Sequence, residues 1–318
     1  MNEGVYRELE ARLGARRLRD RLEMEASMRL GPEPGDDAAV GPSGFVIRFS
    51  RPAERVIRGL LKATALYGLG SRNYRDIRVV ENRVRVPKLD PGLEGLRILQ
   101  LSDLHIDLDP RLVEVILERI IPLEDDLALL TGDYRNARKP DISDCLVAMR
   151  RIVQELDPPV FGILGNHDTI EMVSELEDMG LPVLLNEGRK VSTRKGFVYV
   201  AGIDDPHRFR NHDIEKAAAN NNWRNFAVLL SHSPEVYAEA EPHVDLMLCG
   251  HTHGGQICLP GGYAVLRKCR CPRRMLKGPW RYKSLRGYTS PGTGATCVPV
   301  RFNCPPEITV HVLGTGND

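Results

Sequence analysis

Residue types that bind metal ions recur at the ends of five apolar runs in this sequence. The runs and the residues after them are LRILQL with Asp103 and His105, LALLT with Asp133, VFGIL with Asn166 and His167, FAVLL with His232, and VDLMLC with His251 and His253. Carboxylates and imidazoles gathered at one buried edge need a counter-charge, which divalent cations supply. Mixed nitrogen and oxygen ligands favour Mn, Fe, Zn or Ni over Ca²⁺.

Two pairs of candidate ligands are each separated by a single residue. In an extended segment, the side chains of residues i and i+2 point to the same side. The spacing therefore predicts that Asp103 and His105 face one ion together, and that His251 and His253 face one site. The five runs are thus expected to converge on a shared metal site.

The apolar runs have the length and composition of strands that are buried on both faces. Residues 110–122 and 141–156 instead show the apolar spacing of helices. Strands that alternate with helices predict an α/β fold, in which functional groups gather beyond the carboxyl ends of the strands. The glycines at 132, 165 and 250 fit sharp turns after strands, where a side chain would obstruct close approach.

The motif order resembles that of the calcineurin-like metallophosphoesterases. DLH, GD, GNHD, SH and GHTH follow one another within about residues 93–314. The longer stretches GHTHGGQICLP and PVRFNCPPEI resemble a bacterial branch of small phosphodiesterases and membrane-lipid phosphoesterases. The resemblance implies an α/β sandwich of two central β-sheets flanked by helices.

The resemblance also implies two divalent metal ions, with Mn expected first and Fe, Zn or Ni as alternatives. Asp133 would bridge the two ions, and His167 matches the residue placed near the scissile phosphate as general acid or transition-state donor. The matching ligands are Asp103, His105, Asp133 and His253 for the first metal, and Asp133, Asn166, His232 and His251 for the second.

One position departs from the family pattern. Many members carry Asp three residues after the bridging aspartate, where it supports the catalytic histidine, and this sequence has Asn136 there. An amide cannot stabilise an imidazolium as a carboxylate does. Either Asp168 or Asp141 supplies the support, or His167 acts mainly as a neutral donor.

The implied reaction is hydrolysis of a small anionic phosphoester or phosphodiester by a hydroxide that bridges the two ions. One alternative is a lipid or nucleotide-sugar substrate of the UDP-diacylglucosamine type, cleaved at the inner membrane surface. Another is a non-catalytic binding scaffold. The retention of all seven ligand positions argues against the scaffold.

Three regions are predicted along the chain: a charged helical extension and Gly/Pro linker over 1–44, a basic helix and strand over 45–92, and the metallophosphoesterase domain over 93–318. Leucines of the first helix drift around its axis, which predicts a loosely attached surface helix. Residues 77–87 alternate as expected for an exposed or edge strand.

Residues 51–66 combine apolar residues at helical spacing with several arginines. One interpretation is a helix packed on its own domain with a solvated basic face. The other is peripheral contact with an anionic membrane surface. The sequence leaves both open.

Overall charge gives no sign of a nucleic-acid partner. The chain has 44 Lys and Arg against 43 Asp and Glu, and no specific nucleic-acid motif. The charged N-terminus lacks the apolar segment of a secretory signal, and no apolar run approaches the ~18 residues of a membrane span. A cytoplasmic location is predicted, with contact at the inner membrane face left open.

Residues 246–306 hold ten Lys and Arg and no Asp or Glu. This basic segment either forms a positive wall that attracts an anionic substrate or is a solvated basic loop. A polar loop over 204–213 is a further candidate for the border of the site.

Overall fold

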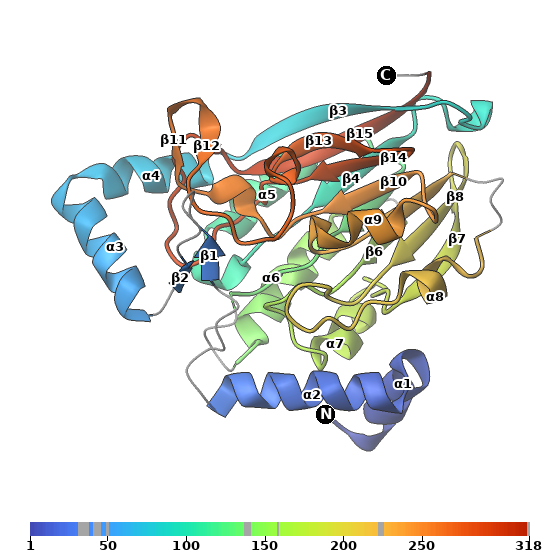
Figure 1. The fold of residues 1–318 in the computed structure, drawn as a ribbon, viewed down its shortest axis with the longest axis horizontal. Helices are drawn as coiled ribbons and strands as arrows, with labels where there is room; N and C mark the ends of the chain where they lie inside the picture. The colour runs from blue at the N-terminus through green and yellow to red at the C-terminus, as the bar shows by residue number, and fades with distance from the viewer. Residues whose placement is uncertain are drawn as a thin grey trace.

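The computed structural model describes residues 1–30, 38–40, 46–48, 51–136, 141–157, 159–221 and 226–316. Two β-sheets pack face to face over a shared apolar core, and helices cover their outer faces (Figure 1). The predicted α/β sandwich is therefore confirmed.

The first sheet has five strands, and its parallel centre carries three of the apolar runs. β4, β5 and β6 are parallel, β15 runs antiparallel to β4, and β3 lies at the edge, as its alternating pattern predicted. In spatial order, the strands are β3 (Arg78–Val86), β15 (Glu307–Thr315), β4 (Arg97–Leu101), β5 (Leu127–Leu130) and β6 (Val160–Gly162).

The second sheet has six strands, and its parallel centre carries the other two runs. β8, β9, β10 and β14 are parallel, while β7 and β13 pair antiparallel at the two edges. In spatial order, they are β13 (Gly278–Tyr282), β14 (Leu285–Thr289), β10 (Leu246–Cys249), β9 (Ala227–Leu230), β8 (Gly196–Gly202) and β7 (Glu187–Thr193).

The central strands are apolar throughout because both of their faces are buried. In β5, Leu127 and Leu129 point into the core between the sheets, while Ala128 and Leu130 point toward the helices. Side chains alternate across a strand, so a strand covered on both faces needs an apolar residue at every position.

Helices on both outer faces complete the layers. α5 (Leu112–Ile120), α6 (Ser143–Gln154) and α7 (Met172–Asp178) cover the five-stranded sheet. The short helices α8 (Ile214–Ala218) and α9 (Tyr237–Ala240) pack on the other sheet. Two small hairpins pair β1 (Ala38–Val40) with β2 (Val46–Arg48), and β11 (Cys258–Leu259) with β12 (Tyr263–Ala264).

The N-terminal segment is not the loosely attached helix that its drifting leucines predicted. It forms α1 (Glu3–Leu13) and α2 (Ala15–Leu30), separated by Gly14. Leu9, Leu13 and Leu18 are buried in the core that α5, α6 and α7 share. The break at Gly14 changes the direction of the chain. Leucines that would point to different sides of one continuous helix therefore face the core from two separate helices.

The predicted basic helix near residues 51–66 is part of a helix pair, α3 (Arg51–Ala63) and α4 (Leu66–Arg75), which lies at one side of the molecule (Figure 1). Ile57 and Leu61 pack on residues near 300, as expected for a helix packed on its own domain, while Leu60 is exposed. Most of the predicted linker over 31–44 lies outside the described residues, and the division of the chain into three regions stays a prediction. Among the described residues, no helix is long and apolar enough to cross a bilayer.

Candidate metal centre

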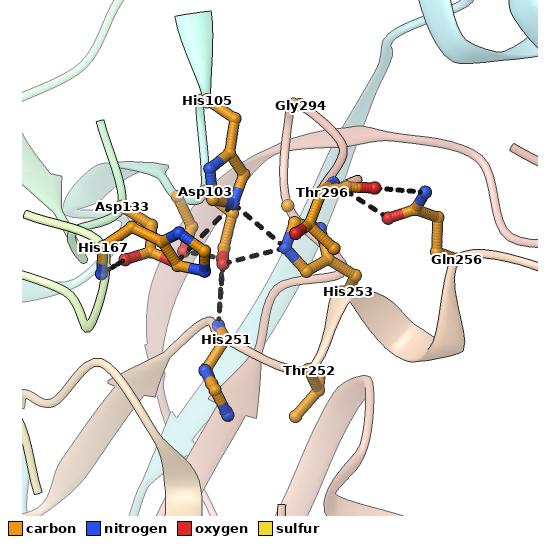
Figure 2. A network of polar contacts seen from close by, with 12 residues as sticks. Asp103, His105, Asp133, His167, His251, Thr252, His253, Gln256, Gly294 and Thr296 are labelled. Carbon is orange, nitrogen blue, oxygen red and sulfur yellow. Dashed lines mark hydrogen bonds and ion pairs between the residues drawn. The ribbon is translucent and has the colours of Figure 1, made fainter. Parts of the chain in front are cut away.

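The seven predicted ligands come together in loops that follow the parallel strands of both sheets. Figure 2 shows five of them, namely Asp103, His105, Asp133, His251 and His253. All seven side chains are buried. They follow β4 with Asp103 and His105, β5 with Asp133, β6 with Asn166, β9 with His232, and β10 with His251 and His253. Because the two sheets align their carboxyl ends, five loops distant in sequence meet at one place.

The first cluster comprises Asp103, His105, Asp133 and His253. The Nε2 atoms of His105 and His253 lie 3.2 Å apart. Asp103 Oδ1 is 3.4 Å from His253 Nε2, and Asp133 Oδ2 is 3.6 Å from His105 Nε2. Carboxylate and imidazole atoms thus converge on a common point, as they do in a metal site.

The second cluster comprises Asp133, Asn166, His232 and His251. His232 Nε2 lies 3.2 Å from Asp133 Oδ2 and 3.0 Å from Asn166 Oδ1. His251 Nδ1 lies 2.8 Å from the same amide oxygen. Asp133 Oδ2 is therefore close to both clusters, which is the placement expected of a bridging ligand.

Hydrogen bonds on the far side of two histidines indicate that a cation fits here. His105 Nδ1 lies 2.8 Å from the carbonyl oxygen of Arg135, and His232 Nδ1 lies 2.8 Å from that of Thr131. A carbonyl accepts, so each Nδ1 carries a proton, and each Nε2 points inward, where it can offer a lone pair to a cation. At the second cluster, His232 Nε2 faces the oxygens of Asp133 and Asn166, and either a proton on Nε2 or a divalent cation in its place satisfies these atoms.

The pKa values reflect the same concentration of negative charge. Burial acts to lower the pKa of His232, but the neighbouring Asp133 carboxylate raises it to about 10. Burial acts to raise the pKa of Asp133, but His232 and His167 hold it well below its usual range. The pKa of Asp103 is raised, chiefly because burial removes the carboxylate from water. A positive charge is therefore favoured beside Asp133.

The backbone at five of the seven predicted ligands is left-handed, so the predicted extended geometry is wrong. Asp103, His105 and Asp133 have φ values of 50°, 41° and 57°, and His251 and His253 have 69° and 49°. Such conformations cost of order 1–3 kcal/mol each for residues with a side chain. The chain turns sharply at the strand ends, and His251 and His253 therefore diverge into separate clusters.

Glycines before three of the ligands are needed for space, as predicted. A Cβ atom on Gly132 would overlap the backbone of Gly165, and one on Gly165 would overlap Asp133 Oδ1. A Cβ atom on Gly250 would overlap the side chains of Ser102 and Asp103. The ligand loops approach so closely that any side chain here would push them apart.

His167 lies beside the first cluster without belonging to it. Its ring centroid is 5.0 Å from that of His105, and its backbone N–H donates to Asp133 Oδ1 at 2.8 Å. Asn136 is buried and donates its backbone N–H to Asp107 Oδ1 at 2.7 Å. No described residue forms a hydrogen bond with the side-chain amide of Asn136.

Asp168 holds the ligand loops together. Its carboxylate accepts the backbone N–H groups of Asp133, Tyr134 and Gly165 at 2.7, 3.0 and 2.8 Å. Burial and then the Asp133 charge raise the pKa of Asp168 to about 6. Asp168 is one of the two residues predicted from the sequence to support the His167 ring. In the structure, its contacts instead hold the two loops that carry Asp133 and Asn166.

Asp168 is itself held in place by residues that are distant in the sequence. Arg21 of α2 is fully buried, donates to the Asp168 carbonyl at 3.0 Å, and pairs with the carboxylates of Asp204 and Glu25. Glu25 in turn accepts the backbone N–H of Ile170 at 2.9 Å. This network was not predicted from the sequence, because an arginine in a charged helix carries no local sign of burial.

The predicted border loop does reach the site. The His207 ring centroid is 4.2 Å from that of His251, and its Nδ1 lies 2.7 Å from Glu235 Oε2. Arg208 donates to the Asn166 carbonyl at 3.2 Å. The loop over 204–213 therefore packs directly behind the second cluster.

Arg301 has the corresponding position behind the first cluster. Its buried guanidinium donates to the carbonyl of His253 at 3.0 Å and to that of Pro291 at 2.7 Å. The backbone N–H of Gly294 donates to the Asp103 carbonyl at 2.8 Å. No role was predicted for these residues, because Arg301 is one of ten basic residues in the segment 246–306 and no local pattern distinguishes it from the others.

Comparison with known proteins agrees with this geometry. The model of the calcineurin-like phosphoesterase family matches residues 96–255, about half of the chain. The chain belongs to this family. It is 30% identical over 258 residues to the uncharacterized metallophosphoesterase YkoQ of Bacillus subtilis, covering 76% of this chain and 93% of that protein.

Other relatives give the same result. The chain is 31% identical over 278 residues to the uncharacterized metallophosphoesterase YkuE of Bacillus subtilis, which covers 81% of this chain and 95% of that protein. It is 29% identical over 236 residues to the phosphodiesterase YaeI of Escherichia coli, covering 68% and 82%. This calcineurin-like phosphoesterase is a metal-dependent phosphoester hydrolase that uses divalent metal ions.

Proposed function

We propose that the chain hydrolyses a small anionic phosphoester or phosphodiester with two divalent cations, Mn²⁺ first among them. The observation that carries the proposal is Asp133, whose Oδ2 lies within 3.6 Å of His105 Nε2 and 3.2 Å of His232 Nε2. Two bound cations would supply a water activated as hydroxide and charge for the phosphoryl oxygens. The two clusters would hold those cations, with Asp133 shared between them.

His167 is the proposed proton donor to the leaving oxygen. Its backbone N–H is bound to Asp133, which fixes the start of its side chain beside the first cluster. A positioned acid of this kind contributes about 10²–10⁴ in rate. Asn136 cannot provide the carboxylate that would strengthen this acid, so we expect the loss on removing His167 to lie toward the lower limit and to be largest for poor leaving groups.

The basic segment over residues 246–306 is proposed to attract the anionic substrate. Lys268 is close enough for its charge to contribute to lowering the pKa of both His251 and His253, after the larger effect of burial. The steering interpretation predicts that kcat/KM falls as ionic strength rises. A flat response would favour the solvated basic loop.

Hydrolysis of bis(p-nitrophenyl) phosphate with added Mn²⁺ tests the proposal. Asp133→Asn and His251→Ala should abolish turnover while circular dichroism shows a folded protein. His243→Ala, a histidine outside both clusters, is the matched control and should retain activity. Turnover that survives both ligand substitutions would refute the assignment of the site.

A lipid or nucleotide-sugar pyrophosphate at the inner membrane face is the second candidate substrate. The exposed apolar residues of α3 and α4 favour it, and one relative, from Danio rerio, is a transmembrane protein with a metallophosphoesterase domain. Comparing kcat/KM for a UDP-sugar pyrophosphate and for the simple diester distinguishes the two. A preference for the simple diester would exclude the nucleotide-sugar candidate.

A further inference from the structure

The helix pair α3–α4 exposes apolar side chains that nothing in the described structure covers. Leu60 is 61% exposed, and Val56, one turn earlier, is exposed on the same side of α3. Leu66 and Leu69 are exposed on α4. Single exposed apolar residues are ordinary, whereas four within fourteen residues mark an interaction surface.

The β11–β12 hairpin exposes a second apolar group. Leu259 is 53% exposed, and Ile257 and Tyr263 are also exposed. Arg273 lies over the Tyr263 ring, 4.6 Å from its centroid, and donates to the Ala264 carbonyl. The hairpin thus presents apolar tips with an arginine held beside them.

Phe302 joins the two groups into one surface. On one side it packs in the cluster that holds Ile57, Leu61 and Tyr67 of α3 and α4. On the other side it forms a β-bridge with Ile257, and its carbonyl accepts the N–H of Cys258 at 2.9 Å. Figure 1 shows α3, α4 and the hairpin together at the same end of the molecule.

The charged residues of this surface are almost all basic. Arg55 and Lys62 are exposed on α3, and Arg58 is partly exposed. Between residues 51 and 75 the sole carboxylate is Glu54, whose side chain is nearly buried and lies 3.9 Å from Arg58. The hairpin belongs to the segment 246–306, which has no Asp or Glu.

We propose that this surface, formed by α3, α4 and the β11–β12 hairpin, docks the protein on an anionic membrane. Exposed leucines beside exposed basic side chains match a bilayer interface that offers acyl chains and anionic headgroups together. A second copy of the chain fits less well, because a two-fold contact would bring Arg55 and Lys62 against their own copies. The docking is independent of the hydrolytic activity proposed above.

The surface also lies close to the metal centre. Leu259 follows His253 by six residues. In α4, Gly70 O accepts the N–H of Arg301 at 3.0 Å, and Asn73 Nδ2 donates to the Arg301 carbonyl at 3.1 Å. Because the Arg301 guanidinium holds the His253 carbonyl, α4 and the first cluster are joined through one residue.

Co-sedimentation of the full chain with vesicles tests the docking. Vesicles of phosphatidylcholine with one quarter phosphatidylglycerol should bind the protein at low salt, and pure phosphatidylcholine should bind it at least tenfold more weakly. Leu60→Ser combined with Leu259→Ser should reduce binding about tenfold or more. Arg55→Gln combined with Lys62→Gln should reduce it about 30-fold, at about 1 kcal/mol per basic residue.

Val147→Ser is the matched control, since Val147 is 65% exposed on α6 and lies outside this surface. All variants should cleave bis(p-nitrophenyl) phosphate like the wild type, which separates loss of docking from loss of the enzyme. Equal binding by all variants, or absence of binding to anionic vesicles at low salt, would overturn the proposal. So would sedimentation velocity that shows a dimer dissolved by the leucine substitutions.

Discussion

The two N-terminal helix pairs are both rich in arginine, yet they use it in opposite ways. In α1–α2, Arg21 is fully buried among Asp204, Glu25 and the Asp168 carbonyl, and the leucines face the core. In α3–α4, Arg55 and the neighbouring leucine Leu60 are exposed. The difference lies in the partners, because the rest of the protein offers the buried carboxylate of Asp204 to the first pair and apolar loop residues near 300 to the second.

The comparison shows what each pair can do. A buried arginine with three fixed partners holds its helix in one orientation and transmits that order to the loop of Asn166 and His167. An exposed basic and apolar face does not hold its helix against the rest of the protein and suits a surface such as a bilayer. We therefore expect substitutions in α1–α2 to change stability and catalysis, and substitutions in α3–α4 to change binding.

The largest effect is expected from Arg21→Met. It leaves Asp204 and Glu25 buried without their cation, which costs about 3–5 kcal/mol of unfolding free energy. The loop held through the Asp168 carbonyl should loosen, so kcat should fall more than KM changes. Denaturant unfolding and steady-state kinetics measure the two effects.

Two further variants separate positioning from general stability. Arg16 is exposed on the same helix, and Arg16→Ala should change stability by less than about 0.5 kcal/mol. Arg21→Lys keeps the charge but cannot reach three partners, so it should restore stability more than kcat. Full recovery of kcat by lysine would show that Arg21 acts through its charge alone.

A smaller contrast is expected between two leucines. Leu18 of α2 is fully buried, and Leu18→Ala should cost about 2–5 kcal/mol. Leu60 of α3 is exposed, and Leu60→Ala should cost less than about 0.5 kcal/mol. Urea unfolding of the two variants in parallel measures the difference, and equal costs would mean that α3 is buried in solution.

The sequence alone predicts those parts of the molecule in which a local residue pattern determines the contacts. The five runs predicted buried strands because a strand covered on both faces needs apolar residues throughout, and the residues after them predicted a common edge. The left-handed backbone at Asp103 and His105 was missed, since it follows from hydrogen bonds to the next loop. The burial of Arg21 was missed for a similar reason, because its partner Asp204 is 183 residues away.

The smallest effect concerns the ion pair that holds the end of α4. Arg75 donates to Asp109 Oδ2 at 2.9 and 2.7 Å and is partly exposed, so Arg75→Gln should cost about 0.5–1 kcal/mol at pH 7. Burial acts to raise the pKa of Asp109, but hydrogen bonds from Arg111 and Arg75 hold it below the usual value of about 3.9.

A carboxylate with a lowered folded-state pKa stabilises the fold above its unfolded pKa, and this contribution is lost as the pH falls through the folded pKa. The stability difference between wild type and Arg75→Gln should therefore be constant from pH 7 to about 5 and shrink below about pH 4. Unfolding curves at matched ionic strength measure it. If the difference in stability persists undiminished at pH 3, Arg75 holds α4 by packing rather than by its ion pair with Asp109. Both helix pairs would then be fixed by burial, and they would differ only in the side chains that their outer faces expose.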